Sequence, residues 1–385
     1  MYIYIIVFLV SCSLIALSNK ISNKFFKKII EIIAVLIPCI LAGLRALSVG
    51  TDVQVYVEPL FNLASKSDSF LDYLKMSWYR VWTYKYVADF ELLFNIMVYI
   101  ITKLTHNIQW ILFTIQILII FPIYYGIKKF KQLKNKEWLA MLCFYLLFYN
   151  ISYNAMRQFI SIAILFWGTS CLINEKKGDK KFFLSLILGY FFHKSALLGI
   201  VIFVIYKILK KKSKTNLTLT LGNHKILVRK IALLLIIFLS IIFIFNSSIL
   251  INILELIGLN YYVGYINGNV YFSIGKLIKY VPIILIIIFE YKQLIKNENS
   301  YFYILMFILD ILISYFSTVN IYAVRISYFF QIFNIILFPI LIGTTKYQLN
   351  KIINYVIILL YLGTYWYYNF VIMGANETIP YLLFK

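Results

Sequence analysis

Charged residues are scarce in this sequence, and acidic residues are scarcer still. Only 14% of the 385 residues are charged, and Asp and Glu number 15 against 37 Lys and Arg. A soluble domain carries about a quarter charged residues. Because 62% of the residues are hydrophobic and apolar runs recur along the whole length, the sequence excludes a sizeable soluble domain and indicates a polytopic membrane protein.

Cysteines are few and isolated. Cys12, Cys39, Cys143 and Cys171 each lie singly within an apolar run, and the sequence has no CxxC motif and no Cys/His cluster. This arrangement argues against a disulfide framework and against a metal centre. We therefore expect no bound metal.

Motifs for nucleotide, metal and serine chemistry are also missing. The sequence has no GxxxxGK[ST] and no GxGxxG after a strand, so it does not predict a nucleotide-binding site. The lack of a DxD pair and of HExxH argues against a metal-held sugar nucleotide and a zinc hydrolase. The lack of GxSxG argues against a nucleophile elbow. We expect no cofactor.

Basic residues, by contrast, are abundant and gather in short loops between apolar runs. The positive-inside rule produces this pattern in membrane proteins. The net charge of +22 therefore indicates membrane topology rather than nucleic-acid binding. The clusters comprise Lys24, Lys27 and Lys28; Lys128, Lys129, Lys131, Lys134 and Lys136; Lys176, Lys177, Lys180 and Lys181; and Lys210, Lys211, Lys212 and Lys214.

The apolar runs predict an all-α polytopic membrane protein that forms a single integral membrane domain over residues 1–385. A spanning helix needs roughly 17–25 mostly apolar residues, which leads us to expect about 12–13 spanning or re-entrant helices. Polar intervals near residues 45–90 and 246–276 are expected to be external loops, as is the tail from Met373. The predicted helices cover residues 2–17, 29–44, 91–104, 109–127, 138–149, 156–173, 182–207, 231–245, 277–290, 301–315, 326–343 and 352–370.

Two of these segments decide the topology. Phe182–Lys207 has basic loops at both ends, and two shorter helices that meet near His193 would keep both loops inside. Ser195 is then placed to cap the second helix. Glu91–Leu104 is short, and we interpret it as a segment that does not span. This interpretation keeps the polar interval before it on the same outer side as His193. The alternative is an N-terminus on the inside, with the loop of residues 18–28 departing from the positive-inside rule.

Two ionisable residues, Arg157 and His193, lie within or at the mouths of apolar segments. A charge at membrane depth costs at least a few kcal/mol, which makes each a hypothesis for a functional site. The alternative, that both only reach the interface, stays open. Arg157 precedes Gln158 at a helix start, where a guanidinium can clamp a phosphate. Histidine titrates near neutral pH, so His193 can take a proton from an attacking hydroxyl.

Four further charged residues have two interpretations each. Arg325 begins a predicted helix as Arg157 does, and is either a second phosphate ligand or an interfacial anchor. Asp52, in Gly50-Thr51-Asp52, has a functional interpretation, in which it binds sugar hydroxyls or acts as the base, and a structural one, in which it forms an Asx-turn. Glu91 either faces a cavity or favours a helix N-terminus. Asp310, in mid-helix, either lines a cavity or pairs with an Arg.

The 33 tyrosines exceed what interfacial aromatic belts require. Many lie in predicted outer segments, among them Tyr79, Tyr84 and Tyr86. A ring with a polar tip suits stacking on sugar rings. The alternative is that an AT-rich genome enriches the sequence in tyrosine, which is also a normal residue at membrane interfaces.

Several stretches in order carry a resemblance to a known family. They are GLRALSVGTDVQVY (43–56), Glu91 opening an apolar segment, NAMRQFISIAI (154–164), FFHKSALLG (191–199), VRISYFF (324–330) and IPY (379–381). Together this pattern resembles the EpsG family of Wzy-like polysaccharide polymerases, which act in bacterial exopolysaccharide and capsule pathways. The RQ and HKSA motifs are moderately specific together and weak singly. The matching positions are Arg45, Gly50, Thr51, Asp52, Glu91, Arg157, Gln158, His193, Ser195 and Arg325.

The resemblance implies a GT-C-like glycosyltransferase with many spans in the bacterial plasma membrane. It would join polyprenyl-pyrophosphate-linked oligosaccharide repeat units at the outer face, without a metal or cofactor. Its expected partners are that lipid-linked oligosaccharide, the bilayer and other membrane proteins of polysaccharide assembly, and not nucleic acid. The resemblance implies Arg157, Gln158, Arg325 and Arg45 as substrate-binding residues and His193, Asp52 and Glu91 as catalytic residues, with His193 or Asp52 as the base.

Other functions stay open on the sequence alone. A flippase or transporter of a lipid-linked or anionic oligosaccharide would explain buried charge equally well. Transporters often have repeated halves with Gly- or Pro-broken helices in matching places, and the sequence shows no such repeat. A membrane acyltransferase acting on polysaccharide would also use a histidine, and a non-catalytic assembly component is a third alternative.

Overall fold

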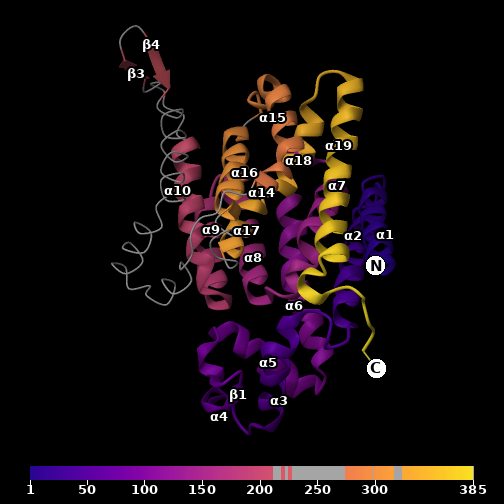
Figure 1. The fold of residues 1–385 in the computed structure, drawn as a ribbon, viewed down its shortest axis with the longest axis vertical. Coiled ribbons are helices and arrows are strands. Elements are labelled where there is room, and N and C mark those ends of the chain that lie inside the picture. Colours follow the sequence, from indigo (N-terminus) through magenta and orange to yellow (C-terminus); the bar gives the residue numbers. More distant parts are fainter. Residues whose placement is uncertain (211–217, 222–223, 228–273, 298, 316–322, 385) are drawn as a thin grey trace. The chain divides into compact units, whose positions relative to one another are not determined.

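The structure is a computed structural model that describes residues 1–210, 218–221, 224–227, 274–297, 299–315 and 323–384 (Figure 1). The chain forms two compact units. Unit 1 comprises Met1–Leu197 and Leu359–Lys385, and unit 2 comprises Leu198–Ile358. The predicted helix 231–245 and nearly all of the predicted loop 246–276 lie outside the described residues.

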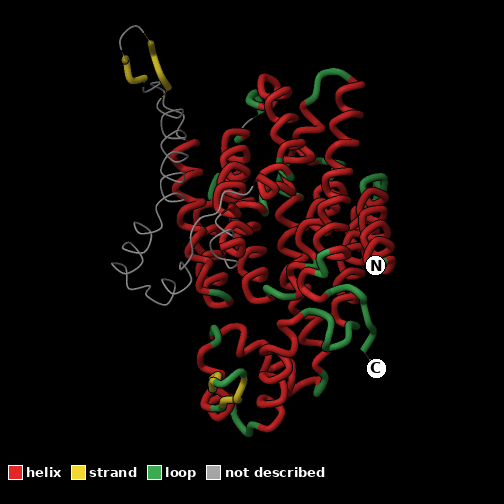
Figure 2. The backbone as a smooth tube through the Cα atoms, viewed as in Figure 1, coloured by secondary structure: helices red, strands yellow, loops and turns green. Residues whose placement is uncertain are grey.

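Helices make up most of the described chain, and its strands form two short hairpins (Figure 2). The predicted all-α fold is therefore confirmed. In unit 1 the helical elements are α1 (Tyr2–Ser18), α2 (Lys24–Gly43), η1 (Val53–Val57), α3 (Glu58–Lys66), α4 (Phe70–Lys75), η2 (Val87–Asp89), α5 (Leu92–Thr105), α6 (Ile108–Ile127), η3 (Lys131–Leu133), α7 (Glu137–Phe144), η4 (Tyr145–Tyr149), η5 (Ile151–Tyr153), α8 (Met156–Asn174), α9 (Gly178–Phe192), η6 (Lys194–Leu197), η8 (Tyr367–Ile372) and η9 (Ala375–Glu377).

Unit 2 holds the elements from α10 onward, up to the first half of α19. Strands β3 and β4 pair antiparallel, and α19 begins in unit 2 and ends in unit 1. The elements are α10 (Leu198–Lys210), β3 (Thr218–Leu221), β4 (His224–Leu227), α14 (Ile274–Ile278), α15 (Val281–Leu294), α16 (Ser300–Tyr315), α17 (Ala323–Gln331), α18 (Asn334–Thr344) and α19 (Gln348–Trp366).

Length and composition allow three described helices to cross a membrane, namely α6, α8 and α19 with its extension to Ile372. The pair α17 and α18 raises this number to four if it forms one span. Several shorter apolar helices accompany them, including α1 and α16. The polytopic membrane fold is thus supported, while the predicted single helix 326–343 is broken in the structure by a 42° bend.

Helix α8 is the centre of unit 1, packed between α6 and α9. Its contact with α9 depends on small residues, because a Cβ on Gly168 would lie 1.8 Å from Ser185 Oγ. In lipid there is little hydrophobic force between helices, so close approach through small residues is a main source of their association. This packing holds the first turn of α8 and the last turn of α9 at the same end of unit 1.

Residues 45–90, predicted to be an external loop, are folded as a lobe with α5 (Figure 1). The lobe contains α3, α4 and a hairpin of β1 (Ser77–Arg80) and β2 (Thr83–Tyr86). Helix α5 has 14 residues and so measures about 21 Å, less than the roughly 30 Å hydrocarbon core. It packs on α3, α6 and α9, which joins the lobe to the bundle.

The C-terminal tail is fixed against the chain that follows α2. Ala46 N–H donates to Leu382 O at 2.8 Å, and Phe384 N–H donates to Leu44 O at 2.9 Å. Gly50, with φ +90°, donates its N–H to Glu377 O at 3.1 Å. A left-handed backbone and a Cβ position only 3.1 Å from Asn154 both require glycine here. The tail therefore holds the turn that leads into Asp52.

Candidate active site

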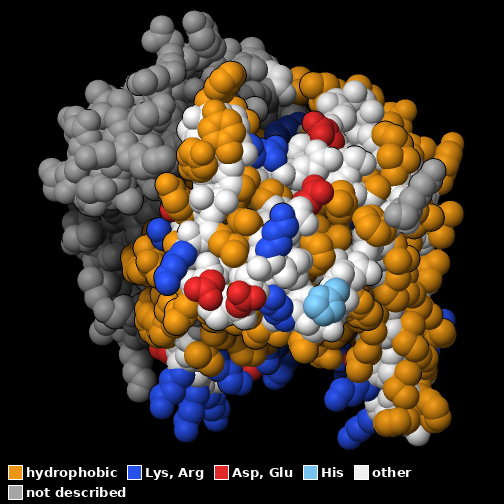
Figure 3. Space-filling view, turned by 90° about the horizontal axis from the view of Figure 1, so that it is seen from below, with side chains coloured by type: hydrophobic (Ala, Val, Ile, Leu, Met, Phe, Trp, Pro, Cys, Tyr) orange, Lys and Arg blue, Asp and Glu red, His pale blue; other side chains and the backbone are white. Residues whose placement is uncertain are grey.

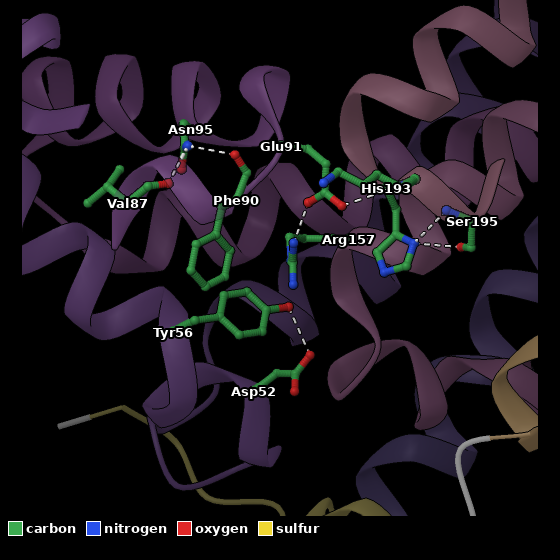
Figure 4. A network of polar contacts seen from close by, with 10 residues as sticks. Asp52, Tyr56, Val87, Phe90, Glu91, Asn95, Arg157, His193 and Ser195 are labelled. Atoms are coloured by element: carbon green, nitrogen blue, oxygen red, sulfur yellow. Dashed lines mark hydrogen bonds and ion pairs between the residues drawn. The ribbon is translucent and has the colours of Figure 1, made fainter. Parts of the chain in front are cut away.

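An ion pair between Arg157 and Glu91 is the centre of a polar cluster in unit 1 (Figure 4). Arg157 is the second residue of α8, and Glu91 is the residue before α5. The Arg157 side chain is 21% exposed and that of Glu91 is 9% exposed. The pair therefore joins the lobe to the bundle while a part of the Arg157 side chain stays accessible.

Glu91 has a second partner at the end of α9. Its Oε1 accepts the backbone N–H of Lys194 at 3.3 Å. The carboxylate thus holds the first turn of α8 and the residue after His193 at the same time. Its own position is fixed by Asn95, whose Nδ2 donates to Val87 O at 2.8 Å and Phe90 O at 3.0 Å.

Three aromatic rings surround the guanidinium of Arg157. Its central carbon lies 4.5 Å from the ring centroid of Phe90, 5.1 Å from Tyr56 and 5.9 Å from Phe94. A cation over an aromatic face gains about 0.5–2 kcal/mol, more when it is removed from water. These rings and Glu91 hold the guanidinium in one orientation.

Asp52 and Tyr56 form the second part of the cluster. The Tyr56 hydroxyl donates to Asp52 Oδ2 at 2.8 Å, across one turn of chain. Burial of Tyr56 and the neighbouring Asp52 carboxylate raise the pKa of this tyrosine well above its usual value. The hydroxyl therefore remains protonated and orients the carboxylate.

His193 ends α9 and contacts Ser195. Its Nδ1 lies 2.5 Å from Ser195 Oγ, and the backbone N–H of Ser195 approaches the same nitrogen at 3.2 Å. Because a backbone N–H can only donate, Nδ1 acts as the acceptor, and the proton of the neutral ring is assigned to Nε2. In the view of Figure 4 the ring lies on the side of Arg157 opposite Phe90.

The β1–β2 hairpin forms the wall of the site behind Phe90. Trp78 stacks on Phe90 with centroids 5.7 Å apart, and Arg80 Nη1 donates to Gln54 O. The opposite face is open, with Tyr79 paired to Tyr84 in register. Both tyrosines are exposed, and Trp82 at the turn is 87% exposed.

The hairpin turn has an unusual backbone. Its two central residues, Val81 and Trp82, have φ of 45° and 63°. Two-residue turns with two positive φ values normally use Asn or Gly, and such a conformation costs other residues about 1–3 kcal/mol each.

Figure 3 shows apolar, basic and acidic side chains and a histidine close together on the face seen from below.

The remaining predicted residues lie elsewhere. Arg45 is 1% exposed, and its guanidinium stacks on Tyr153 at 3.9 Å and donates to Ala42 O at 2.8 Å. Gln158 follows Arg157 but is buried within the bundle. Arg325 lies on α17 in unit 2 with an exposed side chain. Ser195 lies in η6 and does not cap α10, because α10 begins at Leu198.

The opposite end of α8 carries a different charged cluster. Glu175 accepts from Lys129 Nζ at 2.6 Å and from Lys181 Nζ at 2.7 Å. The two lysines lower the pKa of Glu175 to about 2. These contacts bring two of the basic loops, after α6 and after α8, together at one end of unit 1.

Sequence reasoning found the charged residues of the cluster but missed its aromatic rings. Tyr56 follows Asp52 by four residues and Phe94 follows Phe90 by four. Such spacing places two side chains on one helical face and was the available signal for Tyr56, whereas Phe90 lies in extended backbone before α5. Within the described chain, no three His, Cys, Asp or Glu side chains come together as metal ligands. The cluster itself offers a fixed guanidinium, an oriented carboxylate and an imidazole.

Fold and site together define a polytopic helical membrane protein with a charged cluster at one end of its bundle. The EpsG family model matches residues 28–383, so the chain belongs to the EpsG family, as its motifs predict. This is a Wzy-like polymerase family, and membership supports a polysaccharide polymerase role. No curated protein and no solved structure matches the chain.

Proposed function

We propose that the protein is a glycosyltransferase that joins polyprenyl-pyrophosphate-linked oligosaccharide repeat units into a polysaccharide. The observation that carries the proposal is the Arg157–Glu91 pair within the ring cage of Tyr56, Phe90 and Phe94. A fixed guanidinium on a side chain that is 21% exposed is suited to an anionic group that enters from one side. Glu91 in this proposal is a positioning residue.

In the proposed reaction a hydroxyl oxygen of the acceptor sugar attacks the anomeric carbon of the donor. The bond from that carbon to the pyrophosphate oxygen breaks, and its electron pair leaves with the pyrophosphate. Arg157 stabilises the charge that grows on the leaving group. The acceptor hydroxyl gives its proton to a base of the protein.

Asp52 is the base in this scheme. The hydrogen bond from Tyr56 holds one carboxylate oxygen in a fixed direction, and a carboxylate accepts through both oxygens. His193 takes another role, because its Nδ1 already accepts from Ser195. Its Nε2–H would donate to the pyrophosphate or to a sugar hydroxyl. The hypothesis that His193 is the base requires the opposite tautomer.

The open face of the hairpin would bind the sugars. Tyr79, Tyr84 and Trp82 are exposed, and Trp78 on the reverse face connects the hairpin to Phe90. Aromatic faces stack on sugar rings, and their polar tips bond hydroxyls. The strained turn at Val81 and Trp82 is typical of segments whose shape serves binding.

The outer leaflet is the proposed side of the reaction, in the bacterial plasma membrane. The support comes from the charge distribution, because Lys129 and Lys181 lie at the Glu175 end of α8 and the cluster lies at the Arg157 end. Positive loops stay inside. Arg325, on α17 of unit 2, stays a prediction as a substrate-binding residue. Gln158 and Arg45, both buried, would support the site through packing.

The test uses the full-length protein in proteoliposomes supplied with its lipid-linked repeat unit. Arg157→Lys keeps the charge but loses the planar fork, and we expect polymer formation to fall about 100-fold or more. A matched control is Lys129→Arg at the other end of α8, which should polymerise normally. A separate leaflet assay should find lipid-linked units in the outer leaflet with either variant. Units that stay in the inner leaflet with Arg157→Lys would instead identify a flippase.

A further inference from the structure

Unit 2 contains a broken helix with a buried carboxylate beside the break. Helix α17 ends at Gln331 and α18 begins at Asn334, with a 42° bend between them. Asp310 of α16 faces this break, since Asn334 Nδ2 donates to Asp310 Oδ2 at 3.1 Å. Non-helical backbone at membrane depth is tolerated where it is buried in protein or lines a cavity.

Three oxygen atoms at the break have no hydrogen bond within the described chain. They are Oδ1 of Asp310, Oδ1 of Asn334 and Oε1 of Gln331. The three residues are 0%, 1% and 4% exposed. A buried oxygen without a partner is unfavourable, and each such atom in a native structure calls for a ligand or another explanation.

Glu290 provides a comparison within the same unit. It is also buried, at 7% exposure, and its Oε1 accepts from Asn354 Nδ2 at 3.2 Å. Asn354 donates in turn to Thr345 Oγ1 at 3.0 Å. No oxygen of Glu290, Asn354 or Thr345 is both buried and without a partner among the described residues. Missing partners are therefore a property of the break and not of every buried acid in unit 2.

The charge and the atom types at the break define the ligand class. One carboxylate and two amide oxygens form a set of hard oxygen donors, which suits alkali and alkaline-earth cations. Ser327 also contacts Asp310, and Lys279 acts on it electrostatically from an exposed position. Because only one carboxylate is present in this set and a lysine lies nearby, the charges at the break favour a monovalent cation over a divalent one.

From this geometry we propose that Asp310, Asn334 and Gln331 form a site for one monovalent metal cation, Na⁺ or K⁺, at the α17–α18 break. The carboxylate supplies the charge and the two amides complete the shell. Broken helices in membrane transporters also bind Na⁺ at their breaks, there through unwound backbone carbonyls, whereas the ligands proposed here are side chains. The site is independent of the polymerase proposal, because none of its residues belongs to the Arg157 cluster.

Thermal unfolding of the full-length protein in detergent tests the site. Choline chloride is replaced by NaCl, KCl or LiCl at constant ionic strength. For the wild type we expect a saturable rise of a few degrees in Tm with at least one of these metal ions, since a ligand of the native state stabilises it. Asp310→Asn should lose this rise, and Glu290→Gln should retain it. A wild-type Tm that does not respond to the metal ion, or that responds only to pH, overturns the proposal.

Gln331→Leu gives a second measurement if Asp310→Asn does not fold. Leucine removes an unpaired buried oxygen, so the Tm in choline should rise. The loss of a ligand should raise the half-saturating cation concentration several-fold in the same protein. A purely structural Gln331 would leave that concentration unchanged. Such a result in the folded Gln331→Leu protein would overturn the proposed site.

Discussion

The two ends of α8 both carry an ion-paired glutamate, but in different surroundings. At the first turn, Glu91 pairs with Arg157, and the side chains are 9% and 21% exposed. After the last turn, Glu175 pairs with Lys129 and Lys181, and the side chains are 28%, 26% and 48% exposed. Three aromatic rings surround Arg157 at the first end, whereas Lys129 at the other end lies 5.9 Å from the ring of Trp167.

This difference distinguishes a candidate functional site at the Arg157 end from a structural contact at the Glu175 end. When one partner of a buried pair is removed, an uncompensated charge is left, whereas an exposed pair contributes about 0–1 kcal/mol. The Arg157 end therefore has a single geometry that can serve chemistry. The Glu175 end holds two basic loops together and can tolerate change.

Asp52→Asn should have the largest effect on the Arg157 end. The amide keeps the size of the side chain but no longer accepts a proton, and loss of a general base lowers a rate by about 10²–10⁴-fold. Polymer formation measured in proteoliposomes should fall by this factor while binding of the lipid-linked donor is retained. Equal loss of donor binding would assign Asp52 to the binding of substrate instead of proton transfer.

Glu91→Gln should damage both stability and activity. The Arg157 guanidinium would lose its counter-charge in a partly buried place, at a cost of about 1–3 kcal/mol, and polymerisation should fall with its positioning. The double variant Glu91→Gln with Arg157→Gln should recover the Tm but not the activity. If the double variant is as unstable as Glu91→Gln alone, the ion pair does not explain the loss.

His193→Gln should retain more polymerase activity than His193→Ala. Glutamine offers an N–H donor in place of Nε2–H but cannot act as a base, so we expect about a tenfold difference, the effect of roughly one charge-assisted hydrogen bond. Initial rates of the two variants at saturating donor decide this. Two equally inactive variants would favour His193 as the base and the opposite tautomer.

Phe90→Leu should have a smaller effect, because it removes one face of the cage around Arg157. A cation–π contact of about 0.5–2 kcal/mol corresponds to a decrease of about 2- to 30-fold in activity. Phe94→Leu is the matched control, since its ring is 5.9 Å from the guanidinium instead of 4.5 Å. A larger loss for Phe94→Leu would contradict the assigned geometry.

Glu175→Gln should have the smallest effect, within about 1 kcal/mol of stability and without loss of polymerisation. Because the lysines lower the pKa of Glu175 to about 2, its stabilising contribution is present above its ordinary pKa. The contribution decreases as the pH falls from that value toward 2. The Tm difference between wild type and Glu175→Gln, measured from pH 7 downward, should therefore shrink in that range. A constant difference would show that the ion pairs do not contribute.

Much of the fold followed from hydrophobic patterns. The expected helices 2–17, 109–127 and 156–173 agree closely with α1, α6 and α8, because apolar runs of this length have few other stable structures in lipid. The division of Phe182–Lys207 into two helices was also expected, from the charges of its flanking loops. The break between Gln331 and Asn334 was not expected, because the stretch around these two polar residues is apolar enough for one continuous helix. The hydrogen bond from Asn334 to Asp310 at the break joins two helices, and no local pattern predicts it.

The sequence alone determined that this is a helical membrane protein of the EpsG type and that Asp52, Glu91, Arg157 and His193 were residues to consider. Composition and motif order carry that information locally. Only the tertiary structure decided that Glu91 pairs with Arg157, 66 residues away, and that Arg45 is buried against Tyr153 instead of joining them. Such pairings depend on how helices pack, and no local pattern in the chain encodes which charged residue meets which.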